Sequence, residues 1–249
     1  MIRALLIRRF WLLGKNITST VLLSFLFPMV IFIFINLAFR RVLVNVVYDI
    51  DFDTWIYPSM VLFASVLSII PSIFRDLFDL RIHKKVLTYL SITPYSKVFL
   101  ISSFLLVSLI EGIIIGLVSL LLYSFIIPYP FTLVETLSLF FYLSIMIVFL
   151  GNTYITISIL SDKSSTFFIS IFIIIFFILF GSGLVISLDF FPISISNILS
   201  IVPIAMIVNA MQSHLFSGFI DWPIILISIL FICGLLLINS ILLRKKLRQ

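Results

Sequence analysis

Charge, cysteine and histidine are all scarce in this chain. Only 10% of its 249 residues are charged, one residue is a cysteine and two are histidines. The single cysteine, Cys233, excludes an internal disulfide, and the apolar sequence around it suits a small packing residue. The two histidines belong to no His/Cys/carboxylate cluster with metal-ligand spacing, so we expect no structural metal.

Signals for nucleotide and nucleic-acid binding are missing as well. The sequence contains no GxxxxGKS or GxxxxGKT segment, so the chain cannot itself cradle nucleotide phosphates. Its net charge of +6 comes from 16 basic and 10 acidic residues. Nucleic-acid binding would need these basic groups on one soluble face. They lie instead in short patches beside apolar runs, which is typical of topology signals and lipid-headgroup contacts.

Apolar residues, by contrast, dominate the chain. They make up 63% of it, and the mean hydropathy is +1.36. No water-soluble protein of this length has a core large enough to hide so much apolar surface. We therefore expect an integral membrane protein with a single transmembrane domain over residues 1–249.

Six apolar segments each approach the ~20 residues that a hydrocarbon core of ~30 Å requires. Helices are expected, because backbone polar groups in lipid must pair within the segment or in a closed barrel. The segments lack the polar–apolar alternation of a barrel strand. The predicted fold is all-α, with spans near 21–39, 56–74, 99–123, 137–160, 167–187 and 222–243.

Two further segments flank these spans. Residues 1–20 combine Arg3, Arg8 and Arg9 with Trp11, which favours an interfacial helix over a plain basic flank of the first span. Residues 188–221 are too apolar for a free loop and too broken by prolines for a span, so we expect an outer re-entrant or interfacial hairpin. A seventh span there would put the basic C-terminus outside.

The basic residues also predict the orientation. In a six-span arrangement, 14 of the 16 lie on one side, and only Arg40 and Arg41 lie on the other. Because lysine and arginine are enriched in cytoplasmic connectors, both termini are expected in the cytoplasm, with the spans in the cell (inner or plasma) membrane.

The connector 75–97 is longer and more charged than a turn between two spans needs. We interpret it as a cytoplasmic docking element; the alternative is a solvated loop that only orients the spans. The candidate docking residues are Arg75, Asp76, Asp79, Arg81, Lys84 and Lys85.

Polar residues inside the spans are few. Glu111 is the one acid well within a span, and an intramembrane carboxyl indicates a functional site. The equally weighted alternative is a protonated carboxyl bonded to Ser108 or Asn152. Asn152 and Thr156 are the other intramembrane candidates. A serine-protease interpretation needs Ser182 beside its glycines to meet His214, and we consider helix packing more ordinary for Ser182.

The order of four segments resembles the membrane subunit of type-2 ABC exporters. They are a basic N-terminal helix leading to FLFPMVIFIF (25–34), then Trp55-Ile56-Tyr57-Pro58, then the connector FRDLFDLRIHKKVLTYLSITPYSKVFLIS (74–102), and finally SG…FFPISISNILSIVPIAMIVNAM (182–211). The resemblance covers nearly the whole chain, although Ser196 and Val202-Pro203 depart from the proline pattern of the last segment.

The resemblance implies a permease rather than an enzyme. Two permease copies, as a homodimer, would work with two ATPase subunits that bind ATP and Mg²⁺, and this chain would carry no cofactor. The connector would act as a coupling helix, and Phe191, Pro192 and Pro203 would form an outer gate. The expected partners include the bilayer and no nucleic acid, and the cargo would be amphiphilic or lipid-linked: a drug, peptide, glycan or lipid. The alternative function is a passive channel or pore-forming membrane protein.

Overall fold

The structure is a computed structural model that describes residues 2–15, 17–40, 50–83, 96–127 and 131–246. These ranges contain helices and no strand, which confirms the predicted all-α class for the described part of the chain. The longer helices are α1 (Ile2–Lys15), α2 (Ile17–Phe39), α3 (Phe52–Ile73), α6 (Lys97–Ser124), α7 (Leu133–Leu160), α8 (Ser164–Phe180), α9 (Ile193–Ser200), α10 (Pro203–Ser217) and α11 (Trp222–Lys246).

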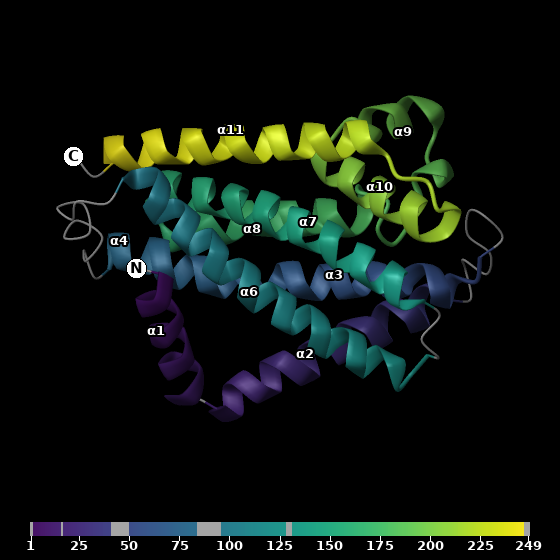
Figure 1. Cartoon of the computed structure of the whole chain (residues 1–249), viewed down its shortest axis with the longest axis horizontal. Helices are drawn as coiled ribbons and strands as arrows, with labels where there is room; N and C mark the ends of the chain where they lie inside the picture. Colours follow the sequence, from purple (N-terminus) through teal and green to yellow (C-terminus); the bar gives the residue numbers. More distant parts are fainter. Residues whose placement is uncertain (1, 16, 41–49, 84–95, 128–130, 247–249) are drawn as a thin grey trace.

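Helix α3 is the centre of the bundle. It packs against α6 and α7 most extensively, and also against α2 and α8 (Figure 1). In its most apolar stretch 83% of the residues are buried, against 17% for α11. Its buried serines, among them Ser59 and Ser65, donate hydrogen bonds from their hydroxyls to backbone carbonyls of the preceding turn. These bonds allow a polar side chain to lie in an apolar core.

Close approach of α6 depends on two glycines one turn apart. A Cβ at Gly112 would lie 2.5 Å from Cδ1 of Ile147, and a Cβ at Gly116 would lie 2.8 Å from Oγ of Ser65. Small residues at this spacing let helix backbones approach in lipid, where packing replaces the hydrophobic driving force. The pair fixes α6 against both α3 and α7.

Within the described ranges, four helical stretches are long and apolar enough to cross a membrane, or five if the bent pair α9–α10 is one broken span. The four are Phe52–Ile82, Lys97–Ser124, Leu133–Leu160 and Trp222–Lys246. Large apolar side chains such as Phe34, Phe172 and Leu230 point outward from α2, α8 and α11. A surface of this kind, on helices of this length, indicates a multi-pass membrane protein.

The boundaries differ most from the predicted ones at three places. The second span was predicted to end at residue 74, but its helix continues through the π-helical segment η2 (Phe74–Asp79) into α4 (Leu80–Ile82). The fifth was predicted to reach 187, but α8 ends at Phe180 with Gly181 as its C-cap, and the chain beyond it turns through Gly183, which has a positive φ of 84°. The interfacial helix, predicted over 1–20, ends as α1 at Lys15.

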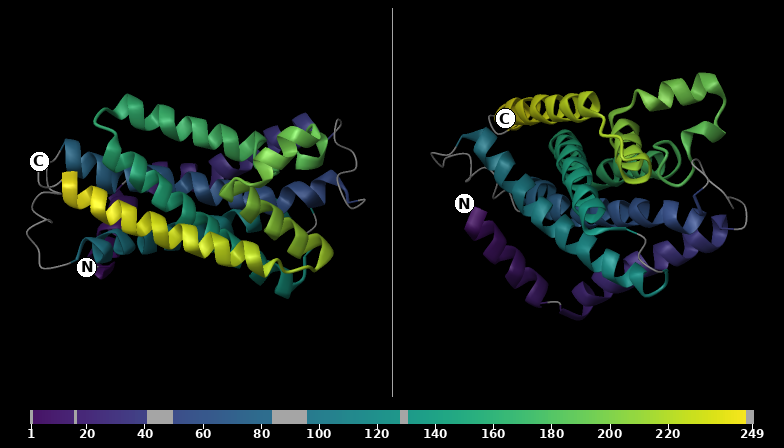
Figure 2. Two further views of the ribbon diagram at one scale, coloured as in Figure 1. Left: turned by 90° about the horizontal axis from the view of Figure 1, so that it is seen from above. Right: turned by 45° about the vertical axis from the view of Figure 1, so that its right-hand side comes forward.

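The charged residues gather at the two ends of the bundle. The start of α1, the end of α4 and the end of α11 lie together at one end, while α9 and α10 lie at the other (Figures 1 and 2). We call the first the basic end and the second the acidic end. Described acids at the acidic end are Asp51, Asp53, Glu135, Asp189 and Asp221, against the single described base Arg40.

Candidate functional site

A buried ionic cluster joins α1 to the base of α3. The Arg9 guanidinium donates to Asp76 Oδ2 at 2.6 Å, and Arg8 Nη1 lies 3.4 Å from the other carboxylate oxygen. The Arg9 and Asp76 side chains are only 7% and 6% exposed. Asp76 lies in the widened turn of η2, just after Pro71, whose missing N–H interrupts the regular ladder.

Glu111 belongs to the same cluster. Ser72 Oγ donates to Glu111 Oε2 at 2.5 Å, and Arg9 Nε lies 3.9 Å from that oxygen. The sequence analysis named Ser108 and Asn152 as partners in one of its two interpretations, and the structure places Ser72 at the carboxyl. Ser72 and Asp76 are four residues apart on one face of the helix, and Glu111 reaches them from α6. The cluster thus connects three helices.

A second set of ion pairs ties α4 to the opposite side of the basic end. Arg81 Nη1 lies 3.3 Å from Asp162 Oδ1 in the turn after α7, and Arg81 Nη2 donates to the Ser161 carbonyl. Lys246 Nζ, at the end of α11, lies 3.0 Å from the same Asp162 oxygen. The hydrogen bond from Lys246 lowers the pKa of Asp162 below its ordinary value, and Arg81 adds to this effect.

These contacts describe what the predicted docking residues do within the chain. Asp76 is buried, Arg81 is paired internally, and Asp79 lies 3.2 Å from His83 Nδ1. Arg75 is half-buried and has no ion pair within 4 Å in the described ranges. Lys84 and Lys85 lie outside the described residues. Docking of an ATPase at these residues stays a prediction. Within the chain, Asp76 and Arg81 form ion pairs that connect the extension of α3 at the basic end to neighbouring segments.

The intramembrane candidates Asn152 and Thr156 meet a residue that the sequence analysis missed. Asn239 of α11 donates to the Asn152 carbonyl at 2.9 Å, and Thr156 Oγ1 donates to Asn239 Oδ1 at 2.7 Å. Both asparagines are fully buried. Polar side chains that are hydrogen-bonded across helices stabilise helix packing in membranes. We therefore interpret this group as a contact between α7 and α11 and not as the lining of a transport pathway. Sequence could have shown only that Asn239 is a polar residue in an apolar run.

The outer-gate candidates Phe191, Pro192 and Pro203 lie at the starts of α9 and α10, at the acidic end. Pro192 precedes α9 as its N-cap residue, and Pro203 opens α10, where its fixed φ suits the first helical position. The two helices meet at 95°. Phe191 is half-buried. A gating role for these three residues stays a prediction.

The described residues do not assemble a serine-protease site. Ser182 is fully buried, and its hydroxyl donates to the Ile178 carbonyl at 2.5 Å. His214 is edge-on to Tyr142, with ring centroids 5.7 Å apart. The described ranges also contain no group of three His, Cys, Asp or Glu side chains that could hold a metal ion.

Comparisons with known proteins found no match. No protein-family profile, no curated protein and no solved structure matches the sequence or the fold.

Proposed function

We propose that the chain is the permease subunit of an ATP-driven exporter, with six membrane-spanning helices: α2, α3, α6, α7, α8 and α11. The four long apolar stretches support the count in part. Helix α2 has 23 residues, and α8, with 17, is about 26 Å long, near the lower limit for a span. Bases at one end of the bundle support an orientation with both termini in the cytoplasm.

The observation that carries this proposal is the set of ion pairs made by Asp76 and Arg81 at the basic end. One continuous helix, α3 with η2 and α4, is joined at its base to α1 and α6 through Asp76 and Ser72. Through Arg81 it is joined to the turn after α7 and to the end of α11. A permease needs such an element, because force from a soluble ATPase has to reach several helices together. The connector that follows residue 83 would receive that force.

The resemblance to type-2 ABC exporters adds the remaining expectations. Two copies of this chain, as a homodimer, would pair with two ATPase subunits, and ATP and Mg²⁺ would bind to those partners. The apolar outer surface of α2, α8 and α11 is consistent with an amphiphilic or lipid-linked cargo taken from the cytoplasm or inner leaflet.

The test is affinity purification in mild detergent, followed by identification of partners and an ATPase assay. We expect an ATPase in stoichiometric amount, lost in the double variant K84E/K85E. The matched control is K163E, a charge reversal on the exposed turn before α8, which should keep the partner. Arg81 is unsuitable for reversal because its internal ion pairs would be broken too.

A chain that purifies alone, with no ATPase activity under conditions that preserve complexes, would contradict the proposal. The passive-channel alternative would then be preferred. Equal loss of the ATPase in K84E/K85E and K163E would instead contradict a specific role for the connector.

A further inference from the structure

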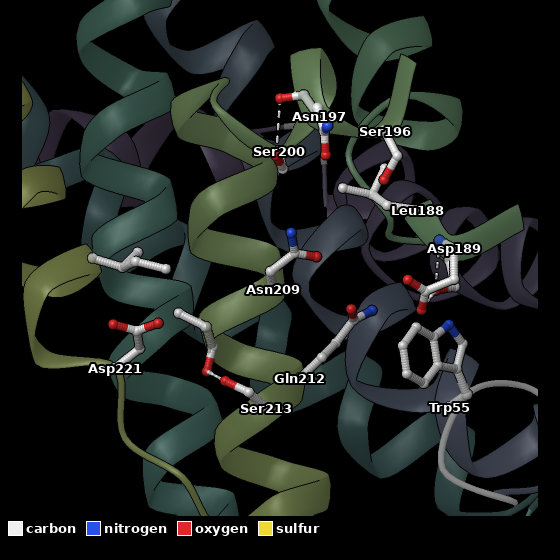
Figure 3. Close-up of a pocket in the computed structure, with 13 residues that line it drawn as sticks. Trp55, Leu188, Asp189, Ser196, Asn197, Ser200, Asn209, Gln212, Ser213 and Asp221 are labelled. Carbon is white, nitrogen blue, oxygen red and sulfur yellow. Dashed lines mark hydrogen bonds between the residues drawn. The ribbon is translucent and has the colours of Figure 1, made fainter. Parts of the chain in front are cut away.

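Two cavities lie at opposite ends of the bundle. The polar pocket beside α9 and α10, of about 390 Å³, lies at the acidic end, with Asp189 and Asp221 on opposite sides of it (Figure 3). The other cavity, of about 500 Å³, is a groove at the basic end, between the end of α3 with η2 and the start of α8. We call it the basic-end groove. Its lining residues are Ile70, Pro71, Phe74, Arg75, Asp79 and Phe168.

The basic-end groove changes from apolar to charged along its length. Ile70 and Phe74 line it from the central helix, and Phe168 lines it from α8, with its ring centroid 5.0 Å from that of Phe74. Arg75 and Asp79 follow towards the end of the helix. At 1.5 Å per residue, the lining from residue 70 to residue 79 covers roughly 13 Å. A groove that is apolar at one end and charged at the other fits an amphiphile.

The apolar wall is open to the surroundings and continues along α8. Pro71 is exposed, and the Phe168 side chain is 50% exposed. Phe172 and Phe176 follow at intervals of four residues and are 66% and 58% exposed. Residues four apart lie on the same face of a helix. The groove therefore opens onto an exposed aromatic stripe along which an acyl chain can lie.

The charge of Arg75 is not neutralised by the described residues. Its guanidinium interacts electrostatically with Arg8, Arg9, Asp76 and Glu111. Asp76 is already paired with both Arg8 and Arg9, and Glu111 lies 3.9 Å from Arg9. Three guanidinium groups thus share two carboxylates. Arg75 Nε is buried and has no hydrogen-bond partner in the described ranges. A buried charged donor without an acceptor is costly, so an anionic ligand at Arg75 would be stabilising.

Asp79, the acid of the lining, does not supply the missing partner. Its Oδ1 lies 3.2 Å from His83 Nδ1, and no ion pair within 4 Å joins it to Arg75 among the described residues. It lies about one turn beyond Arg75 towards the end of the helix. A carboxylate there accepts hydrogen bonds, so it favours a headgroup with hydroxyl groups beyond its phosphate.

The groove lies where α8 begins. Phe168 is four residues after Ser164, the first residue of α8, which is about 6 Å along the helix. If α8 crosses the membrane as proposed, this is the level of the lipid headgroups at the basic end. Basic residues at a membrane surface attract anionic lipids. A free phosphate would gain nothing from the apolar wall, whereas a phospholipid would use both parts of the groove.

We propose that the basic-end groove binds an anionic phospholipid of the adjoining leaflet, with a phosphatidylglycerol-like headgroup. Arg75 donates to the phosphate oxygens, whose geometry its guanidinium matches. One acyl chain lies against Phe74 and Phe168 and continues along Phe172. The lipid supplies the anion that Arg75 lacks and fills the space between α3 and α8. The proposal rests on the span assigned to α8 and is independent of any ATPase.

The test is photo-crosslinking of the full chain in nanodiscs. The photoreactive residue p-benzoylphenylalanine replaces Phe168, and the nanodiscs contain phosphatidylglycerol and phosphatidylcholine with identical acyl chains. Mass spectrometry then gives the ratio of the two lipid adducts. The matched control carries the same photoreactive residue in place of Ile241, which is 56% exposed and lies three residues before Arg244 at the basic end. We expect the ratio of phosphatidylglycerol to phosphatidylcholine adducts to be higher at 168 than at 241.

Variants of the arginine separate the site from general attraction of anionic lipids. R75Q should lower the ratio at 168 about fivefold, the effect of one arginine near a membrane surface, and leave the ratio at 241 unchanged. R75K keeps the charge and should retain most of the enrichment at 168. R244Q, the control, should leave the ratio at 168 unchanged. Because each value is a ratio within one sample, a lower yield of folded protein does not alter it.

Three results would overturn the proposal. The first is an equal ratio at 168 and 241, which would leave only diffuse attraction to the basic end. The second is a ratio at 168 that R75Q does not lower, or that R75Q lowers equally at 241. The third is an adduct at 168 that consists mainly of a co-purified molecule other than a phospholipid, which would make the groove a cargo site.

Discussion

At the scale of single residues, the Arg9–Asp76 pair is the contact with the largest expected effect on stability. Both side chains are buried, so removing one leaves the other charge with only part of its compensation. We expect R9A to destabilise the protein by about 3–5 kcal/mol, the range for breaking a buried pair. The measurement is equilibrium or thermal unfolding in detergent.

The control for this prediction is R3A, since Arg3 lies on the same helix with an exposed side chain. The double variant R9M/D76L removes both charges and should cost less than R9A alone, because the buried Asp76 carboxylate is no longer left without Arg9. If R9A unfolds at the same temperature as R3A, the pair does not hold α1 to α3.

Residue-scale contacts were also the hardest to predict from the sequence. Arg9 and Asp76 are 67 residues apart, and their pairing depends on where α1 turns relative to α3. Glu111 could be recognised as unusual, but its partner Ser72 is one of many serines and carries no distinguishing signal. The polar pocket beside α9 and α10 was missed for the same reason, because its polar residues come from five separate segments.

At the scale of elements, the contact between α6 and α3 rests on the absence of side chains at Gly112 and Gly116. A Cβ at Gly116 would come within 2.8 Å of Ser65 Oγ and 3.1 Å of Leu143 Cδ1. We expect G116V to lower stability by about 1–3 kcal/mol through overpacking. Thermal unfolding in detergent measures this effect.

Gly234 of α11 provides the matched control, because a Cβ there would meet nothing within 4 Å. G234V carries the same substitution on another apolar helix and should leave the unfolding temperature nearly unchanged. A G116V variant as stable as G234V would mean that α6 and α3 can separate at little cost.

Helix positions, in contrast, were largely predictable from the sequence. The apolar runs near 99–123, 137–160 and 222–243 lie within helices whose ends differ from these bounds by only a few residues. The errors arose where local chemistry overrides apolarity. The charged residues after 74 were predicted to form a docking element separate from the span. The helix of the span instead continues through them, because Asp76 and Arg81 find partners inside the protein.

At the scale of the whole molecule, the separation of basic and acidic ends makes the orientation testable. In a C233S background, single cysteines replace Lys163 at the basic end and Phe219 at the acidic end, both exposed positions. Because bases favour the cytoplasm, a membrane-impermeant maleimide should label F219C on intact cells and K163C only after permeabilisation. The reverse pattern would invert the orientation, and labelling of both on intact cells would contradict an odd number of spans between them.

The central position of α3 has a consequence for biosynthesis. The two helices that pack against it most extensively, α6 and α7, are translated later, so the new α3 first meets lipid without them. Arg8 and Arg9, however, precede it in the chain, so the Asp76 charge has its partners before the rest of the bundle exists. The N-terminal helix would thus serve as an early chaperone in cis, keeping the future core of the protein compatible with the bilayer until its neighbours are made.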